Sequence, residues 1–549
     1  MRKLTRVEGR RQKIKLKKDD WIEFDEAGQT VTATILGREK VTGRHYNYFN
    51  VRGEDGMERN VDLERTKYKR VIEEEVNMVI IPQGRHKDPD CIEAKKVELK
   101  KLEEFKSYSV VEDKGQYRIS STWVLWYKGK EVRARLVARG FEELEEVAAD
   151  APTVDKCNLR LALTIIAAQG WEVETSDVKS AFLQGKKLDR LVTVKPPKEA
   201  ILPKGKLWQL EVALYGLNDA SLQFFLKCKE ILIKLGCVQS LVDPALFMKY
   251  GKQKALIGVI VTHVDDFMHG GTLEFKTTVT NKLAEIFQMG KTEAVKFKYV
   301  GYKIEQCEEG IKVDQNEFAA EVEVLDLKPE RARNVEDELE IEEKSLLRKI
   351  AGKIGWLARG TRPDLIFSQI EMSTKFINGR VKDLNQAAKI TRKVKDSESS
   401  LFISNLGPIE DWIIEVSTDA SLGNLNDGVN STEAHLIIIK DSKSKCAPIM
   451  WQANKIRRVV DSSLAAEALS LLAGLEEAIY LREIVEEIFK LKDKTVPVYA
   501  IVDNRGLVDA VHSTAPVTDR RLRRDIGAIK QMLNQKEVHG IGGAQGLSS

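Results

Sequence analysis

The clearest pattern of apolar and polar positions lies in the last quarter of the chain. Short apolar stretches bounded by turn-forming residues predict three strands, and a fourth strand follows further on. Between the third and fourth strands, Ala468, Leu471, Leu475 and Ile479 recur at three- and four-residue intervals, as on an amphipathic helix. We therefore expect a small α/β layer. Its predicted elements, in chain order, are 412–417, 435–439, 448–452, 462–489, 496–502, 506–512 and 521–533.

The middle of the chain alternates between helical and strand-like spacing as far as about residue 325. The pattern predicts a helix over 91–105 and strands over 117–138, with a break at Lys128 and Gly129. The apolar run 255–264 predicts a buried strand. Beyond residue 325, the sequence predicts an acidic linker over 329–344 and helices over 345–359 and 363–376.

The N-terminal region has a different pattern. Residues 19–70 alternate short apolar stretches with Gly, Asp and Asn turns, which predicts a compact β-barrel-like module. Nine Lys and Arg residues within 1–18 form a basic tail. A solvated tail is at least as good an interpretation as a phosphate-binding segment.

Composition narrows the class of protein. A chain of 549 residues that is 42% hydrophobic can form three or four domains. Its net charge of +4 does not by itself indicate a nucleic-acid partner. The six cysteines are widely spaced, which argues against a zinc site and a disulfide framework and favours a reducing compartment. The sequence contains neither a signal peptide nor an apolar segment long enough to cross a bilayer.

Three carboxylates stand out in the middle of the chain. Asp265 and Asp266 follow the apolar run 255–264, and Asp177 lies in a separate strand-like stretch. Adjacent carboxylates joined by a third from another strand can hold divalent metal ions, which at oxygen-only sites most often act on phosphates. Asp177, Asp265 and Asp266 together therefore predict phosphate chemistry.

Four acids mark the ends of elements in the C-terminal layer. Strand ends of such a layer can converge on one crevice, so these acids can meet although they are far apart in sequence. Two Mg²⁺ ions about 4 Å apart would neutralise them and activate a water against a phosphodiester. For any one of these acids taken alone, the alternative is an ordinary solvated carboxylate on the surface. These C-terminal acids are Asp419, Glu467, Asp503 and Asp525.

The ordered motifs of the chain resemble the Pol polyproteins of copia-type retrotransposons over about residues 91–540. The C-terminal motifs are Ser417-Thr-Asp-Ala-Ser421, Ser462-Ser-Leu-Ala-Ala-Glu467, Val502-Asp-Asn504 and Arg521-Leu-Arg-Arg-Asp-Ile526. The upstream motifs are Arg133-Ala-Arg-Leu-Val-Ala-Arg-Gly-Phe141, Asp177-Val-Lys-Ser-Ala-Phe-Leu-Gln-Gly185, Leu214-Tyr-Gly-Leu217, His263-Val-Asp-Asp-Phe267 and Gly360-Thr-Arg-Pro-Asp364.

The resemblance implies a multidomain chain of α+β and α/β units. A right-hand polymerase with fingers, palm and thumb would precede a ribonuclease H-like α/β domain. The module at 19–75 resembles, by position and pattern, the small barrel that closes copia-type integrases. The expected domains are a tail at 1–18, the β module at 19–75, fingers and palm at 91–325, thumb and connection at 326–405, and the ribonuclease H-like domain at 410–540.

The family also implies roles for single residues near an incoming nucleotide. The two-residue period of a strand places Arg133, Arg135 and Arg139 on one face, and the family suggests that Arg135, with Arg133, holds the triphosphate. An ordinary solvent-facing strand is the alternative. Phe182 matches the family's aromatic gate against a 2′-hydroxyl, with core packing as an equal alternative. Gly216 and Gln223 lie in the segment that packs beside template and nucleotide.

The resemblance further implies that both sites work through Mg²⁺ or Mn²⁺. Asp177 and Asp265 would be ligands in the palm, with Asp266 tuning that site, and the four C-terminal acids would be ligands in the nuclease. The implied partners are an RNA template, a DNA primer, an RNA–DNA hybrid and deoxynucleoside triphosphates. No membrane partner is indicated, and the oligomeric state is undefined. The implied location is an intracellular, cytoplasmic particle, with the nucleus as an alternative.

Three departures from the family pattern support a second interpretation. His263 stands where the family usually has Tyr, and Ser221-Leu222 replaces the common Pro-Arg. The segment after His539 is shorter than the usual closing segment, which favours a truncated or decaying copy. The alternative function is thus a non-catalytic relic that retains nucleic-acid binding at most. The complete set of seven acids argues against advanced decay.

Overall fold

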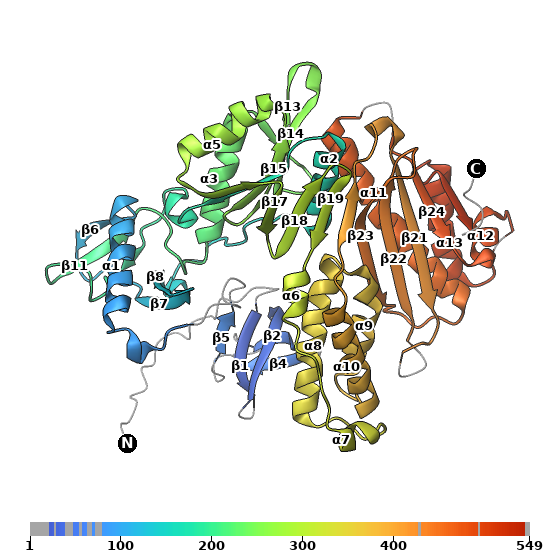
Figure 1. The fold of residues 1–549 in the computed structure, drawn as a ribbon, viewed down its shortest axis with the longest axis horizontal. Helices are drawn as coiled ribbons and strands as arrows, with labels where there is room; N and C mark the ends of the chain where they lie inside the picture. The colour runs from blue at the N-terminus through green and yellow to red at the C-terminus, as the bar shows by residue number, and fades with distance from the viewer. Residues whose placement is uncertain are drawn as a thin grey trace.

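The computed structural model describes residues 80–543 except 426–429, 492–494 and 516, together with five strands between residues 21 and 71. Figure 1 shows the units in chain order: a blue-to-teal unit with small sheets, a green sheet flanked by helices, a yellow group of helices, and an orange sheet with red helices. This arrangement confirms the predicted class of a multidomain chain with α+β and α/β units.

The N-terminal β module is present as one antiparallel sheet. Its strands are β1 (Trp21–Glu26), β2 (Gln29–Arg38), β3 (Tyr48–Gly53), β4 (Glu58–Asp62) and β5 (Tyr68–Val71). The order β4-β3-β2-β1-β5 leaves β4 and β5 at the two edges of the sheet that these described strands form. That this sheet closes into a barrel, and that the module is related to the integrase barrel, both stay predictions. The basic tail at 1–18 lies outside the described residues.

The predicted fingers consist of one main helix and two small sheets. The elements are α1 (Pro89–Glu104), β6 (Tyr108–Glu112), β7 (Ser121–Lys128), β8 (Glu131–Ala138), β10 (Thr193–Val194) and β11 (Lys206–Leu210). The hairpin of β7 and β8 turns at Gly129, whose φ of +64° suits a residue without a Cβ. The predicted break at Lys128 and Gly129 is therefore confirmed. Strands β10, β11 and β6 form the second sheet.

The predicted palm is a six-stranded antiparallel sheet in the order β12-β13-β14-β15-β9-β16. Helices cover both of its faces: Val261 packs on the side of α2, and Ile260 and Phe267 pack on the side of α3. Burial on both faces explains why the run 255–264 is continuously apolar. The elements are α2 (Lys156–Ala168), β9 (Glu174–Val178), α3 (Ala220–Lys234), β12 (Cys237–Gln239), β13 (Leu246–Tyr250), β14 (Leu256–His263), β15 (Asp266–Gly271), α4 (Leu273–Phe275), α5 (Asn281–Ile286) and β16 (Met289–Ala294).

A four-stranded sheet and a helical group follow the palm. The strands are β17 (Lys296–Tyr299), β18 (Tyr302–Cys307), β19 (Gly310–Asp314) and β20 (Leu401–Ser404). The helices are α6 (Asn316–Ala320), α7 (Pro329–Arg333), α8 (Ile341–Gly360), α9 (Ile366–Thr374) and α10 (Val381–Asp396).

The predicted linker over 329–344 is wrong in part. It contains α7 and the first turn of α8, which starts at Ile341 because Glu340 and Glu343 form a capping box. Acidic residues that suggested a solvated linker thus stabilise a helix N-terminus. Helix α10 was not predicted. Its buried face includes Ala387 and Ala388, whose small side chains give a weak apolar signal.

The C-terminal layer matches the predicted order of elements. They are β21 (Ile413–Ser421), β22 (Thr432–Lys440), β23 (Cys446–Lys455), α11 (Ser463–Phe489), β24 (Val498–Val502), α12 (Arg505–His512), α13 (Arg520–Asn534) and β25 (Gly540–Gly543). The sheet order is β23-β22-β21-β24-β25, with β24 parallel to both β21 and β25. Strand β25 was missed because its sequence, Gly-Ile-Gly-Gly, contains one apolar side chain.

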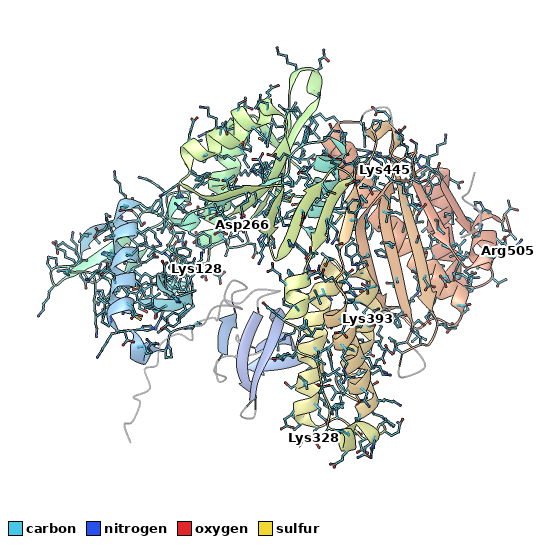
Figure 2. All side chains as sticks on the ribbon, in the orientation of Figure 1. Lys128, Asp266, Lys328, Lys393, Lys445 and Arg505 are labelled. Atoms are coloured by element: carbon cyan, nitrogen blue, oxygen red, sulfur yellow. The ribbon has the colours of Figure 1, made fainter. Side chains whose placement is uncertain are left out.

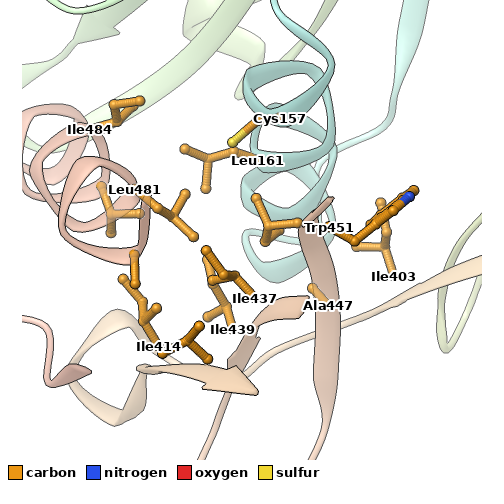
Figure 3. Close-up of a cluster of buried hydrophobic side chains, with 14 of the residues drawn as sticks. Cys157, Leu161, Ile403, Ile414, Ile437, Ile439, Ala447, Trp451, Leu481 and Ile484 are labelled. Atoms are coloured by element: carbon orange, nitrogen blue, oxygen red, sulfur yellow. The ribbon is translucent and has the colours of Figure 1, made fainter. Parts of the chain in front are cut away.

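One hydrophobic core runs from the palm helix α2 into the C-terminal layer. Figure 3 shows Cys157 and Leu161 of α2 in one cluster with Trp451 of β23 and Leu481 of α11. All six cysteines are free thiols, which confirms that no disulfide framework supports the fold. The stability of the two units is therefore coupled through ordinary packing.

Arg160 joins three units at this core. Its Nε donates to the Ile449 carbonyl of β23 at 2.6 Å, and its Nη1 lies 3.3 Å from the Gly360 carbonyl at the end of α8. The guanidinium carbon stacks 4.0 Å from the ring centroid of Trp451, whose indole nitrogen donates to the Ala358 carbonyl at 2.7 Å. Burial lowers the pKa of Arg160. These contacts fix α2, α8 and β23 against one another.

Candidate active sites

The backbone brings Asp177, Asp265 and Asp266, here called the palm acids, together at one end of the palm sheet. Asp266 begins β15 and lies directly opposite Asp177 of β9 in the antiparallel register. The Val178 amide donates to the Asp265 carbonyl at 3.1 Å. In Figure 2, Asp266 lies at the lower margin of the palm in this view. The backbone thus places Asp177, Asp265 and Asp266 side by side, while their joint role in holding a metal ion stays a prediction.

A strained turn places the two adjacent aspartates. His263 ends β14 and pairs with Asp266, so only Val264 and Asp265 connect the strands. Val264 has a φ of 54°, a left-handed conformation that β-branched residues rarely adopt. Strain of this kind persists where the surrounding structure holds it, and it clusters at functional sites. His263, the departure from the family pattern, is therefore paired directly with a palm acid.

The carboxylate of Asp177 is held by the backbone of the neighbouring strand β16. One of its oxygens accepts a hydrogen bond from the Lys291 amide. Gly290 makes this approach feasible, because a Cβ at that position would lie 2.1 Å from the other Asp177 oxygen. The contacts of Gly290 and Lys291 with Asp177 were not predicted from the sequence.

The arginines of β8 differ in their surroundings. Arg133 is exposed and pairs with Glu131 at 2.6 Å. Arg135 lies on aromatic rings, with its guanidinium carbon 3.9 Å from the Tyr215 centroid and 5.6 Å from the Trp126 centroid. Stacking leaves the edge of a planar guanidinium able to donate hydrogen bonds. This geometry suits Arg135 to the predicted phosphate-binding role.

The three other predicted nucleotide-site residues lie on neighbouring segments. Phe182 stands in the short 3-10 turn Ala181–Gln184 and packs partly buried between two core clusters. Gly216 has a φ of +89°, and a Cβ there would lie 2.2 Å from the Ala138 carbonyl oxygen. Gln223 donates through its amide nitrogen to Asp219 at 3.0 Å. Gly216 and Gln223 therefore both contact other parts of the protein: Gly216 packs against β8, and Gln223 binds Asp219.

In this chain Ser221-Leu222 stands where the family commonly carries Pro-Arg, so the cation of that motif is missing from the segment. Arg190 does reach this segment and pairs with Asp219 at 2.7 Å and with Glu143 at 2.8 Å. All three side chains are nearly buried, so the guanidinium is occupied by two carboxylates. The positive charge of Arg190 is therefore neutralised by Asp219 and Glu143 inside the protein.

Three of the C-terminal acids converge closely. Asp419 lies in β21, Glu467 in the first turns of α11 and Asp503 directly after β24. One oxygen from each can be chosen so that all three lie within 4.8 Å of one another. The parallel pairing of β21 with β24 produces this convergence, as predicted from the strand ends.

The environment of Glu467 is unfavourable for a negative charge. The residue is 5% exposed, and its Oε2 is buried without a hydrogen-bond partner. Burial, with repulsion from Asp503 and Asp419, raises the pKa of Glu467 to about 7. An orphaned oxygen beside two further carboxylates fits a hard divalent cation such as Mg²⁺ or Mn²⁺. Asp419, Glu467 and Asp503 are therefore the residues that could hold a metal ion here.

Ser470 supports this cluster and was missed in the sequence. It lies one turn after Glu467 on α11, with its hydroxyl 2.8 Å from the Asp419 carbonyl and 3.0 Å from the Ala434 carbonyl. It thereby ties α11 to β21 and β22. Its three-residue spacing from Glu467 on a predicted helix was an available signal.

The prediction that all four C-terminal acids gather is corrected for Asp525. This residue is buried on α13, and its carboxylate pairs with Arg458 in the loop between β23 and α11. Among the described residues, the cluster that could hold a metal comprises the other three acids alone. In this structure a cation from a neighbouring loop, Arg458, is the partner of the Asp525 carboxylate. The pair Arg457-Arg458 before the predicted helix was the overlooked signal.

Among the helices that the structure describes, none combines the length and the apolar character needed to cross a bilayer.

Comparisons with known proteins agree with the sequence motifs. Residues 105–329 match the family described as reverse transcriptase (RNA-dependent DNA polymerase). The Pol polyprotein of transposon RE2 from Arabidopsis thaliana is 23% identical over 65% of this chain and 25% of the relative. That of transposon TNT 1-94 from Nicotiana tabacum is 25% identical over 76% of this chain and 33% of the relative. The chain thus spans a quarter to a third of these curated relatives.

A solved structure also matches at a low level. It is a foamy viral protease-reverse transcriptase in complex with double-stranded DNA, with a TM-score of 0.48 and 10% identity over 96% of this chain and 99% of that one.

Proposed function

Because the chain belongs to the copia-type family of retrotransposon Pol polyproteins, we propose that it copies an RNA template into DNA and cleaves the RNA of the resulting hybrid. Both reactions would use divalent metal ions. The observation that carries the nuclease half is the convergence of Asp419, Glu467 and Asp503 within 4.8 Å. The polymerase half is supported by the family match and by the pairing of Asp266 with Asp177.

In the proposed polymerase site, the palm acids hold the reacting groups at the end of the palm sheet. When bound, Mg²⁺ or Mn²⁺ would neutralise the triphosphate and lower the pKa of the primer 3′-hydroxyl. Arg135, with Arg133 beside it on β8, donates to the phosphates from the fingers. Phe182 lies against the sugar and excludes a 2′-hydroxyl, which favours deoxynucleoside triphosphates.

In the proposed nuclease site, Glu467 is the group whose protonation sets the state of the cluster. It must lose its proton for Asp419, Glu467 and Asp503 to hold a divalent cation together, and that cation would supply the activation of a water against a phosphodiester. Asp525 is not part of this three-acid cluster, and Arg458 holds its carboxylate. Arg458 would have to yield this carboxylate for Asp525 to reach a metal ion.

The proposed partners are an RNA template, a DNA primer and their hybrid product. Hybrids are recognised through backbone, groove shape and 2′-hydroxyls, so we expect little sequence preference and a steep loss of binding with salt. A filter-binding series over salt measures this slope. A flat series would contradict the proposed binding mode.

The test is Mg²⁺-dependent extension of a DNA primer on an RNA template, followed by cleavage of labelled RNA in a hybrid. Asp265→Asn should abolish extension and leave cleavage, whereas Asp503→Asn should abolish cleavage and leave extension. Asp509→Asn, an exposed acid on α12, is the matched control and should retain both. If wild type and mutants are equally inactive while hybrid binding persists, the proposal fails and the relic interpretation is correct.

A further inference from the structure

Three side chains from separate segments form one stack beside the palm. Arg135 comes from β8, Phe182 from the turn after β9, and Tyr215 from the loop after β11. The guanidinium carbon of Arg135 lies 3.9 Å from the Tyr215 ring centroid. The rings of Tyr215 and Phe182 have centroids 4.9 Å apart, with an interplanar angle of 50°. Tyr215 is therefore the shared neighbour of the predicted phosphate-binding arginine and the predicted sugar gate.

The backbone fixes Tyr215 relative to β8. The Ala138 amide donates to the Tyr215 carbonyl at 2.8 Å, and the Gly140 amide donates to the Gly216 carbonyl at 3.1 Å. The approach is so close that a Cβ on Gly140 would lie 2.4 Å from the Gly216 carbonyl oxygen. The loop therefore has little freedom to shift along β8, and the ring position is set by the fold.

The contacts on the two sides of Tyr215 have different physical origins. Its ring face attracts the Arg135 guanidinium through the aromatic quadrupole, and Trp126 provides a second ring at 5.6 Å. Toward Phe182, the tilted ring pair gives both shape contact and a preferred orientation. A smaller, flexible side chain at 215 would release both neighbours at once.

We propose that Tyr215 is a positioning residue that sets the Arg135 guanidinium and the Phe182 ring together, so that triphosphate binding and sugar selection depend on one side chain. This inference rests on the proposed polymerase function. Removing the Tyr215 ring gives Phe182 space to retreat, which opens the gap that a 2′-hydroxyl would need. The same change removes the stack that keeps Arg135 in line with the phosphates.

The first test measures single-nucleotide incorporation by the full chain with dNTP and rNTP. For Tyr215→Leu, we expect KM for dNTP to rise about 5- to 30-fold, from the loss of a cation–π contact. The preference for dNTP over rNTP, as a ratio of kcat/KM values, should fall at least about threefold because the packing against Phe182 is lost. Tyr215→Phe keeps the ring and should retain both values. Hybrid cleavage by the same preparations confirms that each variant is folded.

A second variant tests the coupling without altering Tyr215. Arg135→Lys keeps the charge and loses the planar stack. Because Tyr215 would then lose one of its two neighbours, we expect the dNTP preference to fall although Phe182, the sugar gate, is unchanged. A rise in KM with an unaltered preference would overturn the proposal. A Tyr215→Leu enzyme with the wild-type preference would overturn it as well.

These outcomes separate this inference from the proposed function. If wild type does not extend a primer at all, the polymerase proposal itself fails. If wild type extends normally and the Tyr215 and Arg135 variants keep its selectivity, the polymerase proposal stands and only the role of Tyr215 is lost.

Discussion

Replacing Glu467 with Gln should stabilise the C-terminal layer at alkaline pH in the absence of divalent ions. The pKa of Glu467 is raised from 4.5 to about 7 by burial and by repulsion from Asp503 and Asp419. Because the folded state holds this proton more tightly than the unfolded state, the contribution of Glu467 to stability is fully present below pH 4.5 and is lost as pH rises through 7. Gln is neutral throughout and avoids that loss.

The size of the effect follows from the shift. A difference of about 2.5 units at about 1.36 kcal/mol per unit gives an upper limit of about 3 kcal/mol. We therefore expect Glu467→Gln to match wild type near pH 4.5 and to exceed it by up to about 3 kcal/mol at pH 8. Adding Mg²⁺ at pH 8 should stabilise wild type more than Glu467→Gln, because a bound cation neutralises the same charge.

Hydrogen exchange of peptides from β21 and α11 measures this local stability in EDTA at each pH. Glu483→Gln is the matched control, since Glu483 is exposed on the same helix. It should show no comparable pH-dependent gain. If Glu467→Gln is less stable than wild type at pH 8, or if its gain is the same at every pH, the unfavourable charge inferred for Glu467 is wrong.

Three further perturbations have defined outcomes. Arg160→Met removes donors to buried backbone carbonyls and should cost about 3 kcal/mol in urea unfolding, with both activities lost at the same urea concentration. Gly216→Ala places a Cβ 2.2 Å from the Ala138 carbonyl oxygen at a φ of +89°, so primer extension should fall at least tenfold, on the order of 1.4 kcal/mol or more, while hybrid cleavage persists. Arg458→Gln frees Asp525 to bind cations, so the Mg²⁺ concentration for half-maximal hybrid cleavage should fall; an unchanged or higher midpoint would show that the ion pair does not compete with metal.

Much of the C-terminal layer could be predicted because its signals are local. Each element has its own apolar period, and each acid stands where an element meets the sheet edge. The convergence of Asp419, Glu467 and Asp503 needs only the parallel arrangement of β21 and β24 in addition. The family motifs added roles for single residues, including Phe182 and Arg135, that periodicity alone could not assign.

The features that could not be predicted depend on contacts between residues far apart in the sequence, which leave no local pattern. Arg160 and Ile449 are 289 residues apart, and no spacing along the chain indicates that they touch. The capture of Asp525 by Arg458 crosses 67 positions, so the sequence could not show that the fourth acid already has a partner. The prediction of a linker over 329–344 was wrong for a different reason. Acidic residues favour both helix capping and exposure to solvent, so their presence does not distinguish a helix start from a linker.

The core that α2 shares with the C-terminal layer has a consequence for how copies of such an element decay. Leu161 and its neighbours on α2 are buried partly by β23 and α11. A copy interrupted before β21 would lose the nuclease acids and also leave this palm helix facing water. The two proposed activities would therefore depend on each other: a truncation before β21 that spares every proposed polymerase residue is expected to silence primer extension as well.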